Sequence, residues 1–130
     1  MSKKSSRLKY LDRTLLIGPY MALCTDEETF KRECKRLGIA TEQVPTWLTP
    51  SAHATTHHFI NTDTGHCHIV CIKKDLKRTR PQIYALLTHE AYHVWCGAME
   101  YLGEKNPGEE IVAYGIQNIS QSLMEAYEQL

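Results

Sequence analysis

Residues 79–101, TRPQIYALLTHEAYHVWCGAMEY, are the stretch of this chain that decides its fold. Thr79 and Gln82 have the spacing of a capping box, in which two side chains bond the free backbone N–H groups at the start of a helix. Pro81 suits the first helical turn, where its missing N–H is not needed. The sequence therefore predicts a helix that opens at this box and continues to about Tyr101.

The middle of this helix carries His89, Glu90 and His93 in the pattern H-E-x-x-H. Residues four apart project from nearly the same line on a helix, so the two imidazoles can reach one ion. A catalytic zinc ion takes three protein ligands and keeps a position for water, which it activates near pH 7. Within the motif, Glu90 is the residue placed to act as general base.

A third zinc ligand has to come from elsewhere, and carboxylates downstream are the candidates: Glu100, Glu104, Glu109 and Glu110. Asn106 is a natural N-cap for a closing helix that runs to the C-terminus, with Pro107 at its first position. Glu109 would then fold back to cap that helix, which favours Glu110 as the ligand. Glu109 stays an alternative because it lies nearer the apolar stripe of the closing helix.

Upstream of the motif, the sequence predicts extended pieces and one helix. The apolar run at 14–24, TLLIGPYMALC, resembles a strand or two short strands broken at Gly18-Pro19. Thr25 and Glu28 form a second capping box, and the helix that they open ends at Gly38. An irregular connection follows.

A β-hairpin is expected next, because TTHHFI and HCHIVCIKK flank the turn-forming residues NTDTG at 61–65. Alternation places Cys67 and Cys71 on the face of Ile69 and leaves His66 and His68 on the other face. Buried thiols are the usual outcome for such cysteines. Together with the nearby histidines they could instead form a second metal site, and these histidines are His53, His57, His58, His66 and His68.

Composition excludes several classes of protein. Fifteen basic and fifteen acidic residues in 130 leave no net charge to attract nucleic acid or an anionic membrane. No apolar run approaches the roughly 20 residues that span a bilayer. Five cysteines form no C-x-x-C pair, and the start lacks the features of a secretory signal, so we expect a cytoplasmic protein. Residues 1–9 read as a disordered basic tail, and 10–130 as one domain.

The pattern H-E-x-x-H on one helix, followed by E-x-x-A-Y near the start of the next, resembles the gluzincin metallopeptidases in their smallest form. It is similar to the minigluzincins and to the ImmA/IrrE-like peptidases. The phrases HEAYHVW, NP and AYGIQ also resemble those of short phage-encoded zincin-like proteins. The resemblance covers residues 80–127 in detail and the hairpin at 54–73 in outline.

This resemblance implies an α+β fold of the zincin type, with a small, mostly antiparallel sheet and three main helices. It makes His89, His93 and Glu110 zinc ligands and Glu90 the general base. Tyr114 stands where related proteins often have an acidic or amide residue that orients a ligand histidine, and its phenol could do the same or could donate a hydrogen bond to the oxyanion. Related chains often carry an acidic residue where this one has Val112, which puts part of the support around the ligands in doubt.

A peptide or protein is the substrate that the resemblance implies, and the cytoplasm of a phage host is the implied setting. An edge strand within His66–Ile72 is expected to hold that peptide by β-augmentation. Two other functions remain open. The chain could be a binding or regulatory module that keeps zinc for stability without turnover, or a scaffold without metal that contacts a partner protein.

Overall fold

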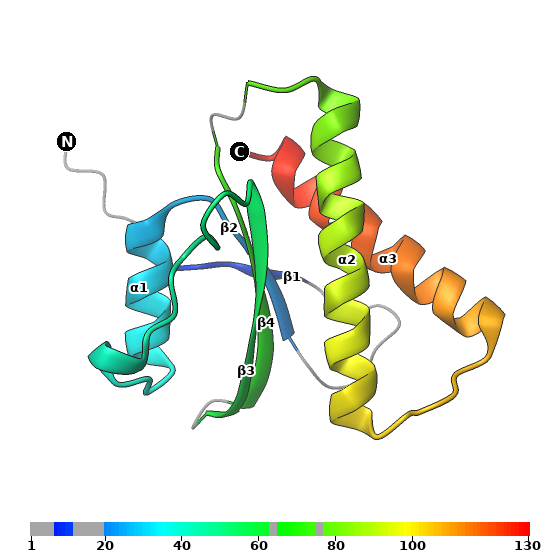
Figure 1. The fold of residues 1–130 in the computed structure, drawn as a ribbon, viewed down its shortest axis with the longest axis horizontal. Coiled ribbons are helices and arrows are strands. Elements are labelled where there is room, and N and C mark those ends of the chain that lie inside the picture. Colours follow the sequence, from blue (N-terminus) through cyan, green and yellow to red (C-terminus); the bar gives the residue numbers. More distant parts are fainter. Residues whose placement is uncertain (1–6, 12–19, 63–64, 75–76) are drawn as a thin grey trace.

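The computed structural model describes residues 7–11, 20–62, 65–74 and 77–130. It is an α+β structure with a sheet of four strands and three helices. In chain order these are β1 (Tyr10–Leu11), β2 (Tyr20–Cys24), α1 (Glu27–Arg36), a 3₁₀ turn (Thr41–Gln43), β3 (Ala54–Thr62), β4 (Gly65–Ile72), α2 (Arg80–Leu102) and α3 (Glu109–Glu128). One side of the sheet is covered by α1 and the other by α2 and α3 (Figure 1).

The sheet has the order β1-β2-β4-β3 and is mixed, so the expectation of a mostly antiparallel sheet was wrong. The pairs β1–β2 and β3–β4 are antiparallel, but β2 and β4 run parallel. The reason is the connection between them. After β2, the chain passes through α1, a long loop and β3, and this crossover returns it to the end of the sheet where β2 began.

The predicted hairpin is present as β3 and β4, although its turn residues 63–64 lie outside the described part. Its position in the sheet differs from the expectation. The strand within His66–Ile72 is not at the edge, because β4 pairs with both β2 and β3. The edge strand beside α2 is β3, and residues 12–19, where Gly18-Pro19 was expected to break a strand, lie outside the described residues.

The N-cap of helix α1 is Asp26, one residue after the predicted N-cap Thr25. The carboxylate of Asp26, not the hydroxyl of Thr25, accepts a 2.8 Å hydrogen bond from the backbone N–H of Thr29. The second carboxylate oxygen of Asp26 accepts a 2.8 Å hydrogen bond from the Thr29 hydroxyl, which adds to the stability of this cap. The helix then buries Phe30 and Cys34 against the sheet.

Helix α2 confirms the prediction made from the capping box. The Thr79 hydroxyl accepts from the Gln82 backbone, and the Gln82 side chain accepts from the Thr79 backbone at 2.9 Å. Gly103, at φ 75°, ends the helix in the left-handed conformation that suits glycine. The buried residues of α2 form one core with β3, β4 and α3.

Helix α3 begins two residues later than predicted. Its N-cap is Gly108, not Asn106, and no side chain caps it. Pro107 therefore lies outside the helix, where its restricted φ fits an extended connection. Glu109 and Glu110 both lie in the first turn, where the helix dipole favours negative charge. Glu109 is thus not occupied as a cap, and that reason for preferring Glu110 disappears.

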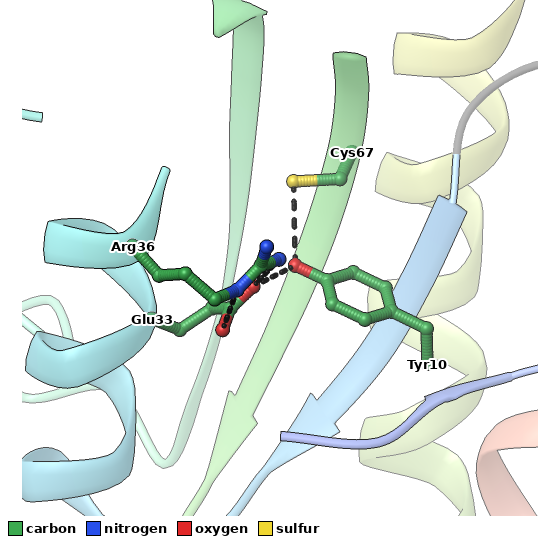
Figure 2. A network of polar contacts seen from close by, with 4 residues as sticks. All are labelled: Tyr10, Glu33, Arg36 and Cys67. Carbon is green, nitrogen blue, oxygen red and sulfur yellow. Dashed lines mark hydrogen bonds and ion pairs between the residues drawn. The ribbon is translucent and has the colours of Figure 1, made fainter. Parts of the chain in front are cut away.

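A polar network joins β1, α1 and β4 on the α1 side of the sheet (Figure 2). The Tyr10 hydroxyl donates to Glu33 at 2.7 Å, and Arg36 donates to the same carboxylate through Nε and Nη2. Burial alone would raise the pKa of Glu33, but the hydrogen bonds from Arg36 and Tyr10 outweigh burial and lower it. The network ties the short strand β1 to α1.

Leu8 is buried in the core on the α1 side, whereas residues 1–6 of the expected tail lie outside the described part.

Among the described helices, none combines the length and the apolar character needed to cross a membrane.

The contact between α2 and α3 gives a first prediction. A Cβ on Gly115 would lie 2.0 Å from the Trp95 ring, so Gly115→Ala must push the two helices apart. We expect it to lower the free energy of unfolding by about 1–3 kcal/mol, although alanine favours helix. Urea denaturation measures this. Gly108→Ser is the control, since a Cβ there meets nothing within 4 Å, and equal stability of the two variants would contradict the prediction.

Candidate metal centre

The two motif histidines lie together on the exposed side of α2. His89 and His93 bring their Nε2 atoms to 3.3 Å from each other, with ring centroids 5.0 Å apart. Two imidazoles bound to one tetrahedral zinc ion at about 2.0–2.1 Å would hold their nitrogens roughly 3.3 Å apart. The rings are at hydrogen-bond distance from each other, and the same separation also fits two ligands of one ion.

Glu90 points to a different neighbour. Its side chain is 5% exposed, and its Oε1 accepts a 2.7 Å hydrogen bond from the hydroxyl of Thr56 on β3. The carboxylate thus lies between the motif helix and the edge strand. A buried carboxylate costs free energy unless it has such a partner, so Thr56 fixes the position of Glu90.

Helix α3 packs on another side of α2. Gly115 meets Trp95, and Glu128 near the end of α3 bonds Arg80 and Tyr84 near the start of α2, so the helices are antiparallel. At about 100° per residue, Trp95 lies roughly 200° around the helix from His93. The face of α2 that contacts α3 is therefore not the face that carries the imidazole pair.

Glu110 and Tyr114, the other predicted site residues, are exposed on α3. Within the described ranges, no group of three or more His, Cys, Asp or Glu side chains is arranged to hold a metal ion. The structure thus brings together His89 and His93, with Glu90 on the neighbouring face, and does not gather Glu110 or Glu109 beside them. The choice of the third ligand stays a prediction.

The remaining histidines separate into three environments. His57 bonds the Trp47 carbonyl at 2.9 Å and packs against Phe30 on the α1 side, and His53 is exposed. On the α2 side, three histidines form a cluster under the second half of α2, and they are His58, His66 and His68.

The cysteines follow the predicted alternation. Cys67 and Cys71 are buried with Ile69 on the α1 side, and no disulfide joins the cysteines, all of which lie in the described part. Burial raises the pKa of both thiols, so they stay protonated. Cys96 is exposed.

Thr56 is the functional candidate that sequence reasoning missed. The signal for it was available, because period-two alternation along the strand puts Thr56 on the same face as His58, toward the motif helix. A threonine in a strand usually indicates β-propensity alone, so its pairing with Glu90 appears only in the packed structure.

Comparison with known proteins adds no assignment: no protein-family model, curated protein or solved structure matches this chain.

The contact between Thr56 and Glu90 gives a second prediction. Thr56→Val keeps the shape of the side chain but leaves a buried carboxylate without its donor. We expect the free energy of unfolding to fall by about 1.5–3 kcal/mol, the usual range for a hydrogen bond to a charged group. Thr56→Ser retains the hydroxyl and should stay within about 1 kcal/mol of wild type. Chemical denaturation at neutral pH measures both, and equal losses would show that the hydroxyl is not the stabilising group.

Proposed function

We propose that this chain is a zinc-dependent metallopeptidase. The observation that carries the proposal is the 3.3 Å separation of the Nε2 atoms of His89 and His93, which suits two ligands of one ion. Both imidazoles come from consecutive turns of a well-capped helix, so their spacing depends on regular backbone geometry rather than on a loop. The third ligand in this proposal is Glu110 on α3, a choice that rests on the resemblance to gluzincins and not on its position in the structure.

When bound, zinc polarises the substrate carbonyl and activates water for attack. The chain's own residues then do the remaining work. Thr56 occupies Oε1 of Glu90, so Oε2 is the oxygen that takes up a proton and passes it to the leaving amine. Tyr114 would donate a hydrogen bond to the oxyanion or orient a ligand, as the resemblance to gluzincins implies.

An extended peptide is the substrate class in this proposal. Strand β3 lies at the edge of the sheet, and its face toward α2 contacts the motif helix through Thr56 and Glu90. A peptide that pairs with this edge gains backbone hydrogen bonds without requiring a particular sequence.

One observation favours a second function, a zinc-stabilised binding or regulatory module without turnover. Glu90 is almost fully buried and is held by Thr56, an arrangement that would also serve a purely structural carboxylate. In that case the edge of β3 would bind a partner segment and release it intact.

Metal analysis tests the ligand set. His89→Ala should lower the zinc content by one equivalent relative to wild type, because a single imidazole on an exposed helix face holds zinc weakly. Glu110→Ala should weaken zinc binding at this site at least 10-fold, whereas Glu109→Ala should leave it unchanged. Competition with a chromophoric chelator measures the affinities. The reverse order of the two glutamates would assign the ligand to Glu109, and no change in any variant would refute the site.

A second measurement separates the enzyme from the binding module. Glu90→Gln removes the proton acceptor but keeps the shape of the side chain and both imidazoles. We expect its zinc content to equal that of wild type and its cleavage of a peptide library to fall by at least 100-fold, the lower range for general-base catalysis. Mass spectrometry of the digests detects cleavage. Absence of cleavage by zinc-loaded wild type would favour the module.

A further inference from the structure

A second group of imidazoles lies where the sheet meets the C-terminal half of α2. His58 on β3 and His68 on β4 are direct partners across the antiparallel pair, and His66 lies two residues before His68 on the same face. Ring centroids are 4.8 Å apart for His58 and His68 and 5.4 Å apart for His66 and His68. Adjacent strands thus place three imidazoles in one cluster.

Three of the six ring nitrogens in this cluster are buried without a protein partner. His66 and His68 are 7% and 1% exposed, yet His66 Nδ1, His66 Nε2 and His68 Nε2 form no hydrogen bond. A buried polar atom without a partner costs about 1–3 kcal/mol, so such atoms normally have an unseen ligand or a role. Three such atoms lie on two adjacent side chains, and a bound ligand would give them partners.

Helix α2 is shaped to leave room for these rings. A Cβ on Gly97 would lie 2.5 Å from His58 Nδ1 and 2.8 Å from His68 Cε1, so any other residue would displace them. Glycine inside a helix costs about 1 kcal/mol relative to alanine. Its presence is explained by the close approach of the imidazoles.

We propose that His58, His66 and His68 bind a divalent transition-metal ion at a site separate from the His89 and His93 pair. Three imidazoles with an open position are a known zinc ligand set, and imidazole also suits cobalt, nickel and copper. The centroid separations match the roughly 5 Å expected for two imidazoles on one tetrahedral ion. His66 and His68 are both buried beside each other, and neutral imidazole is the form that binds a metal ion.

Binding requires one rearrangement. His58 Nδ1 and His68 Nδ1 are 2.6 Å apart and share a hydrogen bond, and the three rings do not yet converge on one point. His58 is the exposed member of the cluster, so its ring can turn and exchange this hydrogen bond for a bond to the ion. His66 and His68 are held by the core and supply the rigid part of the site.

Cobalt(II) titration of the apoprotein tests this proposal, with visible absorption as the readout. The variant His89→Ala/His93→Ala removes the motif pair and should still bind one equivalent of cobalt. Loss of all binding in this variant would overturn the proposal, because it would show that a single ion depends on the motif histidines. The test does not depend on peptidase activity, so failure of the proposed function leaves it intact.

Two further substitutions in that double variant test whether the ion lies in the histidine cluster. His58→Ala removes an exposed ring with little effect on the core, and Gly97→Ala keeps every imidazole but fills their space. Each should weaken cobalt binding at least 10-fold, whereas His53→Ala, an exposed histidine outside the cluster, should not. Unchanged binding in both test variants, or equal weakening by His53→Ala, would refute the site. Circular dichroism confirms that each variant is folded.

Discussion

The structure depends on how α2 packs, because this helix contacts the sheet, α3 and solvent at once. Leu87, Ala91 and Val94 are buried in the core that α2 shares with the sheet and α3. Trp95 packs against Gly115 of α3. Only one side of the helix is then left exposed, and the imidazoles of His89 and His93 occupy it. Their spacing follows from the regular helix, while their exposure follows from the packing.

The edge strand β3 places two polar groups against the same helix. Thr56 bonds Glu90, and His58 lies against Gly97 about two turns further along α2. Strand alternation puts both residues on one face, so a single strand reaches the candidate base and the histidine cluster. The contact between α2 and β3 is therefore where the candidate base and the histidine cluster come closest to the motif helix.

Local signals in the sequence predicted the elements well. The capping box at Thr79 located α2, and alternation assigned Cys67 and His68 to opposite faces of β4. These features depend on residues close together in the chain, for which helix and strand periods are reliable guides. The cap of α1 at Asp26 was missed because Thr25 offered a box of equally good form, and only the formed hydrogen bond distinguishes the two.

Features that depend on distant contacts were harder to predict. The mixed sheet follows from a crossover whose path the sequence does not record, and the identity of the edge strand follows from the same crossover. In the candidate site, the helix period predicted the approach of His89 and His93. The partner of Glu90 was not predictable, because Thr56 lies 34 residues away and reaches it only through tertiary packing.

Strand β3 lies at an edge of the sheet, and its outer side is not paired with another strand of the described sheet. Unpaired backbone groups along an edge strand are a template on which further copies can add, and Ile60, 54% exposed, adds an apolar surface there. The register shift between Phe59 and Thr62 interrupts regular pairing with β4, and such bulges twist an edge away from flat stacking. The edge of β3 is therefore regular up to Phe59 and irregular beyond it, which shortens the stretch on which another strand could pair.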